Sequence, residues 1–110
     1  MKIQNAQFKI IDWNKITNEE YPGIKGTSYW KIFESGNIRS RIVEYSPLFT
    51  SDHYCEKGHV ILVLEGELNI RLKDGEEYKL SPGMSLITED DLSNPHLVFT
   101  TVKTKIFIVD

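Results

Sequence analysis

The stretch that decides the fold is 51–66, SDHYCEKGHVILVLEG, which contains two of the three histidines and the only cysteine. His53 and Cys55 are two residues apart, so on an extended strand their side chains leave the same face. After a Lys-Gly turn, His59 opens an apolar strand that runs to Leu64. If this strand folds back antiparallel on the first, His59 comes level with His53 and Cys55. The stretch therefore predicts three donors able to bind one metal ion.

Short segments that alternate apolar and polar residues flank this stretch, and turn residues separate them. We expect strands at residues 1–12, 29–34, 38–46, 67–72, 77–80, 84–88, 96–100 and 105–109, with residues 12–26 irregular. Asp74-Gly75 is a strong signal for a two-residue hairpin. Many short strands with almost no helix predict an all-β sandwich or barrel. We expect one domain, with a strand and an irregular lead-in over 1–26 and a β-barrel core over 27–110.

Composition narrows the class of protein. The chain has 110 residues, of which 40% are hydrophobic and 26% charged, as in one globular domain. Its net charge of -3 and the absence of a Lys/Arg cluster argue against a nucleic-acid partner. A single cysteine excludes an intramolecular disulfide and fits the reducing cytoplasm. There is no apolar run near the ~18 residues of a membrane span, so we expect a soluble, cytoplasmic protein with no membrane partner.

The spacing of the donors is His53-x-Cys55-x3-His59-x6-Gly66. It resembles the first motif of the cupins, His-x-His-x3-Glu-x6-Gly, in which both histidines and the glutamate bind metal. In this chain Cys55 stands at the position of the second histidine, and His59 stands at the position of the glutamate. The second cupin motif begins with a Pro-Gly turn and ends with a metal-binding histidine, a place that His96 takes here.

More narrowly, the chain is similar to the small cupins known as DHCW-motif cupin fold proteins. These carry an Asp-His-aromatic-Cys run, then Lys-Gly-His, then a Leu-Glu-Gly-Glu-Leu segment. The matching residues here are Asp52, His53, Tyr54, Cys55, Lys57, Gly58, His59, Leu64, Glu65, Gly66, Glu67 and Leu68. The resemblance implies a cupin-type double-stranded β-helix, or jelly roll, with an N-terminal strand extension. It also implies the metal ligands His53, Cys55, His59 and His96.

The chemistry of this donor set is that of a transition metal. Three imidazoles and one thiolate suit one divalent zinc, iron, nickel or copper ion, whereas calcium and magnesium prefer oxygen ligands. Taken singly, His53 and His59 would be read as surface histidines and Cys55 as a small buried hydrophobe. The role of Cys55 stays open between a metal ligand and a redox or supporting group beside the metal.

A second set of residues is a candidate for substrate binding. Arg39, Arg41 and Tyr45 share one strand face, and Trp30 lies on the preceding strand. If that face lines the barrel, the arginines could clamp an anionic substrate by bidentate hydrogen bonds. In the alternative they lie on an exposed sheet and pair with a glutamate: Glu44, Glu65 or Glu67.

Two functions of different classes follow from these residues. The first is a metal-dependent enzyme, of oxygenase, isomerase or lyase type, that acts on a small polar or carboxylated molecule. The second is a non-catalytic module that binds or senses a metal or a small ligand. Four protein ligands around tetrahedral zinc would favour the second. A barrel without metal is the third alternative. Both faces of the strand at 60–64 are apolar, so we expect one of them to be a homodimer interface or the packing surface for the N-terminal strand.

Overall fold

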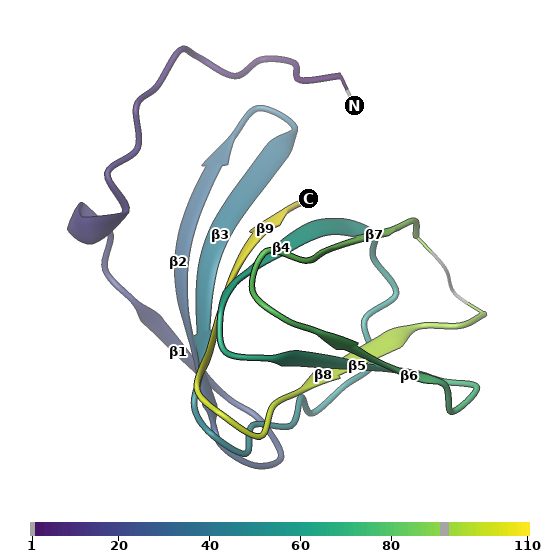
Figure 1. Cartoon of the computed structure of the whole chain (residues 1–110). Coiled ribbons are helices and arrows are strands. Elements are labelled where there is room, and N and C mark those ends of the chain that lie inside the picture. Colours follow the sequence, from purple (N-terminus) through teal and green to yellow (C-terminus); the bar gives the residue numbers. More distant parts are fainter. Residues whose placement is uncertain (1, 91–92) are drawn as a thin grey trace.

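The computed structural model describes residues 2–90 and 93–110, which form two antiparallel sheets that face each other (Figure 1). The elements, in chain order, are the 3-10 helix η1 (Trp13–Lys15) and the strands β1 (Glu19–Pro22), β2 (Thr27–Ser35), β3 (Ile38–Tyr45), β4 (His59–Glu65), β5 (Leu68–Leu72), β6 (Glu77–Leu80), β7 (Ser85–Thr88), β8 (His96–Phe99) and β9 (Thr104–Val109). The described residues contain no helix that is long and apolar enough to span a membrane.

The larger sheet has the strand order β1-β2-β3-β9-β4-β7, and the smaller sheet has the order β6-β5-β8. In the larger sheet Ile61 of β4 lies opposite Ile108 of β9, which lies opposite Arg41 of β3. Because side chains alternate across a strand, this register sends Ile61, Ile108 and Arg41 to the same face. That face is turned toward the smaller sheet, so Arg41 enters the interior with its apolar neighbours.

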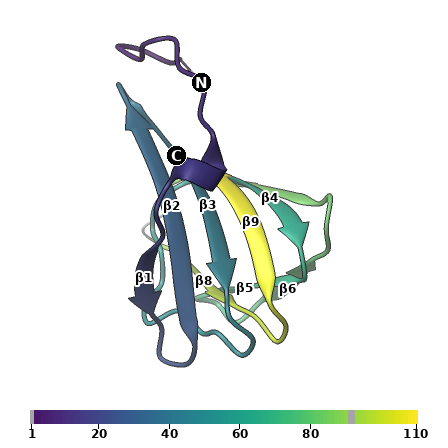
Figure 2. The ribbon, with the colours of Figure 1, turned by 90° about the vertical axis from the view of Figure 1, so that its left-hand side faces the viewer.

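The core lies between the two sheets and is built from alternate residues of the central strands. Its fully buried members include Val43, Ile61, Val63, Leu68 and Ile106. The larger sheet also has apolar side chains on its outer face, where the Trp13 ring of η1 meets the Phe107 ring edge-on at 6.2 Å between centroids. In Figure 2, η1 lies across this outer face. The larger sheet is therefore covered on its inner face by the core and in part on its outer face by η1.

The strand predicted at residues 1–12 is wrong. Residues 2–12 form no strand, and the first strand, β1, lies at Glu19–Pro22 within the segment expected to be irregular. The reason lies in the spacing of the apolar residues. Phe8 and Ile10 are at even positions and Ile3 is at an odd one, so in an extended segment the three side chains would not lie on one face. The described N-terminal extension is thus the short β1, which pairs with β2.

The predicted hairpin between residues 53–55 and β4 is also wrong. Both edges of β4 are already taken, one by β9 and the other by β7. Cys55 instead forms an isolated bridge with His96, and the Gly58 amide donates to the Asp90 carboxylate at 2.5 Å. The chain before β4 therefore crosses toward the smaller sheet, and it brings Cys55 with it.

Gly66 makes the bend at which the chain leaves the larger sheet for the smaller one. Its φ of +80° lies in the left-handed region, and a Cβ there would lie 2.2 Å from the carbonyl oxygen of Lys103. Gly75 has a φ of +98° but nothing within 4 Å of a Cβ, so it offers a matched control.

We expect Gly66→Ala to lower the free energy of unfolding by about 3 kcal/mol, because strain in φ and a backbone clash add. Gly75→Ala should cost about 1 kcal/mol, because only the strain in φ applies. Urea unfolding followed by circular dichroism measures both. Equal losses of unfolding free energy in the two variants would show that the contact with the Lys103 carbonyl costs no stability.

Candidate metal centre

Cys55, His59 and His96 meet at one end of the interior, although they come from three separate segments. Their ligand atoms all lie within 4.8 Å of one another. His59 opens β4 in the larger sheet, and His96 opens β8 in the smaller one. Two backbone hydrogen bonds fix Cys55 beside His96: the Cys55 amide donates to the His96 carbonyl at 2.6 Å, and the His96 amide donates back at 3.0 Å.

The geometry of His59 leaves one ring nitrogen free for a ligand. Its Nδ1 lies 3.1 Å from Oδ2 of Asp110, and its Nε2 lies 3.3 Å from the Sγ of Cys55. Burial raises the pKa of Asp110, but the hydrogen bond from Arg39 and the charges of Arg41 and Arg39 outweigh it and lower that pKa to about 2. The ionised carboxylate accepts a hydrogen bond from Nδ1–H, so Nε2 carries no proton and presents its lone pair to the cluster.

These distances fit one bound metal ion. A tetrahedral ion about 2.3 Å from a thiolate sulfur and about 2.0 Å from an imidazole nitrogen holds the two atoms roughly 3.5 Å apart. The observed separation of Cys55 Sγ and His59 Nε2 is 3.3 Å. The His96 ring meets the His59 ring edge-on at 5.1 Å between centroids, which supplies a second imidazole on the same side. The three side chains therefore form a mixed nitrogen and sulfur donor set.

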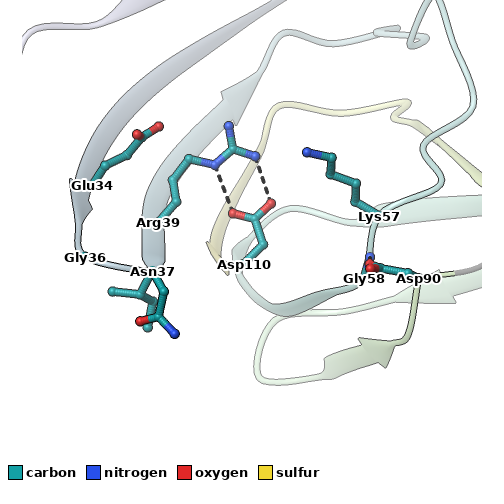
Figure 3. A pocket seen from close by; sticks show the side chains of 9 residues that line it. Glu34, Gly36, Asn37, Arg39, Lys57, Gly58, Asp90 and Asp110 are labelled. Carbon is teal, nitrogen blue, oxygen red and sulfur yellow. Dashed lines mark hydrogen bonds and ion pairs between the residues drawn. The ribbon is translucent and has the colours of Figure 1, made fainter. Parts of the chain in front are cut away.

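Asp110 holds this end of the site together. Its carboxylate accepts two hydrogen bonds from Arg39, at 2.9 and 2.8 Å, and one from Arg41 at 3.0 Å, in addition to the bond from His59. Figure 3 shows the two bonds between Arg39 and Asp110. Bidentate pairs of this kind fix orientation as well as charge. The position of the His59 ring is thus set by an ion cluster rather than by apolar packing alone.

Both buried histidines are less basic than in water. Burial lowers the pKa of His59, and although the charge and hydrogen bond of Asp110 raise it, the net shift from 6.5 is downward. Burial also lowers the pKa of His96, and the neighbouring His59 adds to that shift. Neutral imidazoles are the form that binds metal ions, so the folded protein presents both rings ready for coordination near neutral pH.

A cavity of about 110 Å³ opens beside the three donors. It has room for about four water molecules. The donors form its polar end, together with Ser51 and His53. The remaining lining residues are Ser28, Trp30, Arg41, Tyr45, Phe49, Ile61, Val98 and Ile108. The cavity can therefore accommodate a small molecule whose polar part faces the donors.

Three of the four predicted substrate-binding residues line this cavity. Arg41 is buried, and its Cζ lies 4.7 Å from the centre of the Trp30 ring, a cation–π contact. Trp30 is fixed by its Nε1, which donates to Ser28 at 2.9 Å. Tyr45 stacks near Phe49, and burial raises the pKa of its hydroxyl, which therefore stays neutral.

His53 and Arg39 are placed differently from the other predicted residues. His53 borders the cavity, but its side chain is 71% exposed, and its Nδ1 lies 2.7 Å from Asp52 rather than in the donor cluster. Arg39 lines a separate, open pocket of about 440 Å³ at the same end of the molecule (Figure 3), and its guanidinium is held by Asp110. The structure thus brings three of the four predicted metal ligands together.

Asp110 is the functional residue that sequence reasoning missed. Two of the glutamates considered as partners of the arginines pair with lysines instead: Glu44 approaches Lys105, and Glu67 approaches Lys79, each at 3.7 Å. A signal for Asp110 is present in the period of two along β9. Ile106 and Ile108 face the core, so residue 110 falls on the same face.

Comparison with solved structures shows several similar folds at low sequence identity. A sugar phosphate isomerase of the cupin superfamily from Silicibacter pomeroyi is 18% identical, with a TM-score of 0.70 over 92% of this chain and 74% of that one. A predicted oxalate decarboxylase from Thermotoga maritima is 17% identical, with a TM-score of 0.76 over 92% and 96%. A structure described as FeII HppE is 16% identical, with a TM-score of 0.70 over 94% and 59%.

No family model and no curated protein sequence matches the chain. At the identities found, the structural likeness establishes the fold. The chain has the cupin fold, a small all-β jelly roll, as its resemblance to the cupins implied.

The low pKa values of the buried groups predict how the metal-free protein responds to acid. Unfolded histidines take up protons near pH 6.5, whereas folded His59 and His96 resist protonation. The unfolded state therefore binds more protons as the pH falls, and stability decreases below pH 6.5. Protonation of Asp110, whose ordinary pKa is 3.8, adds a further loss as the pH falls from 3.8 through about 2.

We expect the free energy of unfolding in chelator to fall between about pH 7 and about pH 5. His96→Gln should make this dependence shallower, because one resisting imidazole is gone. Urea unfolding at several pH values measures both slopes. A wild-type protein whose stability does not change over this range would contradict the assignment.

Proposed function

We propose that this protein is a metal-dependent cupin in which one divalent transition metal is bound by Cys55, His59 and His96. The observation that carries the proposal is the convergence of these three donors within 4.8 Å at the polar end of a cavity. In many metal sites a carboxylate accepts a hydrogen bond from a metal-binding histidine without touching the metal, and Asp110 has that relation to His59.

The donor set bears on which metal binds. Two imidazoles and one thiolate suit zinc, iron, nickel or copper, and they do not suit calcium or magnesium. Bound in such a site, the metal supplies a Lewis acid or a centre for oxygen activation. In this chain, Asp110 holds the proton on Nδ1 of His59, and the apolar lining of the cavity limits access of water.

We propose a small polar or carboxylated molecule as the ligand of the cavity. Arg41 is the positive group in the lining, and its buried Nε has no hydrogen-bond partner among the described residues. A buried donor without a partner is costly, and a ligand oxygen would satisfy it. Trp30 covers the guanidinium on one side, and the neutral hydroxyl of Tyr45 can donate or accept a hydrogen bond.

The number of donors favours an enzyme over a closed binding module. Three protein ligands leave a coordination position for substrate or water, whereas a structural zinc site uses four. His53 is not among the three clustered donors, and its exposed side chain has its Nδ1 beside Asp52. The similar structures include an isomerase and a predicted decarboxylase, and one fold that hosts such different chemistries does not select a reaction.

Metal content tests the proposal directly. Untagged protein purified without chelators should contain about one equivalent of zinc, iron, nickel or copper by mass spectrometry. His59→Ala and His96→Ala should lose it, because each removes one of three ligands. His53→Ala is the matched control and should retain it.

Wild-type protein without metal above trace, even after anaerobic reconstitution, would overturn the metal proposal. Loss of metal from His53→Ala to the same extent would instead show that four ligands act together. That outcome would favour the closed, non-catalytic module.

Asp110→Asn tests the supporting role of the carboxylate. The amide can present a nitrogen to Nδ1 and has no charge to match the arginines, so we expect metal affinity to fall by roughly 10–100-fold. Asp52→Asn, which alters an exposed carboxylate beside His53, should leave affinity unchanged. Competition titration with a chromophoric chelator measures both. Equal metal affinities for wild type and Asp110→Asn would show that Asp110 does not support metal binding.

A further inference from the structure

The open pocket that Arg39 lines is a second candidate binding site. Its volume is about 440 Å³, against about 110 Å³ for the cavity beside the donors. Pockets of roughly 300–1,000 Å³ are typical of small-molecule sites. Asp110 lines the open pocket and also bonds to Arg41 and His59, which line the cavity, so its carboxylate lies between the two spaces. The metal and the cavity ligand proposed above leave this pocket vacant.

Two walls of the open pocket are fixed by contacts within the chain. One wall is the turn between β2 and β3, where the Asn37 side chain accepts a hydrogen bond from the Gln4 amide at 2.8 Å. The other wall is the segment 57–58, where a Cβ on Gly58 would lie 2.5 Å from the carbonyl oxygen of Thr88. The pocket is therefore formed before any ligand binds, and this lowers the entropic cost of binding.

Two cationic side chains of the lining have hydrogen-bonding capacity left over. Arg39 donates to Asp110 from Nε and Nη2, and its Nη1 has no hydrogen-bond partner among the described residues. The Lys57 ammonium group makes no ion pair within the same part of the chain. Figure 3 shows the Lys57 side chain extending toward the Arg39–Asp110 pair. One unpaired lysine is ordinary on a surface, but two unused cationic donors in one pocket suit an oxyanion.

The acidic side chains of the lining narrow the class of ligand. Glu34 and Asp90 both line the pocket and are exposed. Asp90 already accepts a hydrogen bond from the Gly58 amide. Ionised carboxylates accept hydrogen bonds and repel further negative charge. The lining therefore fits a molecule that has one carboxylate or phosphate group, together with hydroxyl or amino groups as donors, and it disfavours a polyanion.

Asp110 connects the open pocket to the metal centre. Its carboxylate accepts two hydrogen bonds from Arg39 and one from Nδ1 of His59. An oxyanion on Arg39 would share the guanidinium charge with Asp110 and leave that carboxylate less compensated. A less compensated carboxylate is a stronger acceptor, so the hydrogen bond from His59 strengthens and the imidazole becomes a better metal ligand. The negative charge of the oxyanion also favours a divalent cation nearby.

We propose that the open pocket binds a small molecule through one carboxylate or phosphate group, held by Arg39 and Lys57, and that its occupancy tightens metal binding through Asp110. The pocket stands independently of the metal, whereas the coupling rests on the proposed function. Because linkage is reciprocal, a bound metal raises the affinity for the oxyanion by the same factor.

Calorimetry tests the pocket. Sulfate, a tetrahedral oxyanion like phosphate, and acetate, a carboxylate, are titrated separately into untagged protein at low ionic strength. We expect one saturable site per chain, and the anion that binds more tightly identifies the geometry of the group. Lys57→Glu should weaken binding at least about tenfold, because a repulsive charge replaces an attractive one. Lys25→Glu is the matched control, since Lys25 is also exposed but does not line this pocket.

Three results would overturn the pocket assignment. The first is that neither anion binds. The second is that Lys57→Glu binds as wild type does, which would place the anion elsewhere, such as beside Arg41. The third is that Lys25→Glu weakens binding equally, which would show an attraction to the overall charge of the molecule.

Zinc affinity tests the coupling. Competition with a chromophoric chelator is measured with and without the bound anion, at an ionic strength held constant with sodium chloride. We expect the anion to tighten zinc binding by about fivefold or more, and Asp110→Asn to abolish this effect. Zinc affinity that the anion leaves unchanged would overturn the coupling. Wild type that binds the anion but no metal would overturn the proposed function and the coupling with it, while the pocket assignment would stand.

Discussion

The ion cluster around Asp110 is the constraint on which the site depends. One carboxylate accepts hydrogen bonds from Arg39, Arg41 and His59, so it compensates two positive charges and fixes one imidazole at once. An arginine as buried as Arg41 would be very unfavourable without such a partner. The carboxylate stays ionised because the same arginines stabilise its charge. The interior can thus contain a charged wall beside an otherwise apolar core.

The fold was largely predictable, because period-two alternation and turn residues determine strands locally. The strands later found as β3, β4 and β9 follow directly from that pattern. The partners of each strand were less accessible. Residues 53–55 were expected to pair with the strand that follows them, since neighbours in sequence often pair. The long-range partners of β4 took both of its edges instead, and Cys55 was joined to His96.

The donors of the site were predictable by residue type and spacing, but their grouping was not. Every histidine and the sole cysteine were expected as ligands, and three of these four side chains meet. The fourth, His53, is directed to Asp52, a contact between adjacent residues that spacing does not reveal. Asp110 escaped notice because its importance comes from the register of β9 with β3, which places Asp110 opposite Arg39 and near Arg41. Such a register exists only once the sheet has formed.

The three donors also span the two sheets. His59 belongs to the larger sheet, while Cys55 and His96 are joined by backbone hydrogen bonds on the side of the smaller one. An ion bound to all three would act as a clasp across the sandwich, and its release would require the sheets to part at that end. The rate at which a bound ion exchanges would then be limited by the rate at which the two sheets separate at that end. Metal exchange would thus report on an opening motion of the fold.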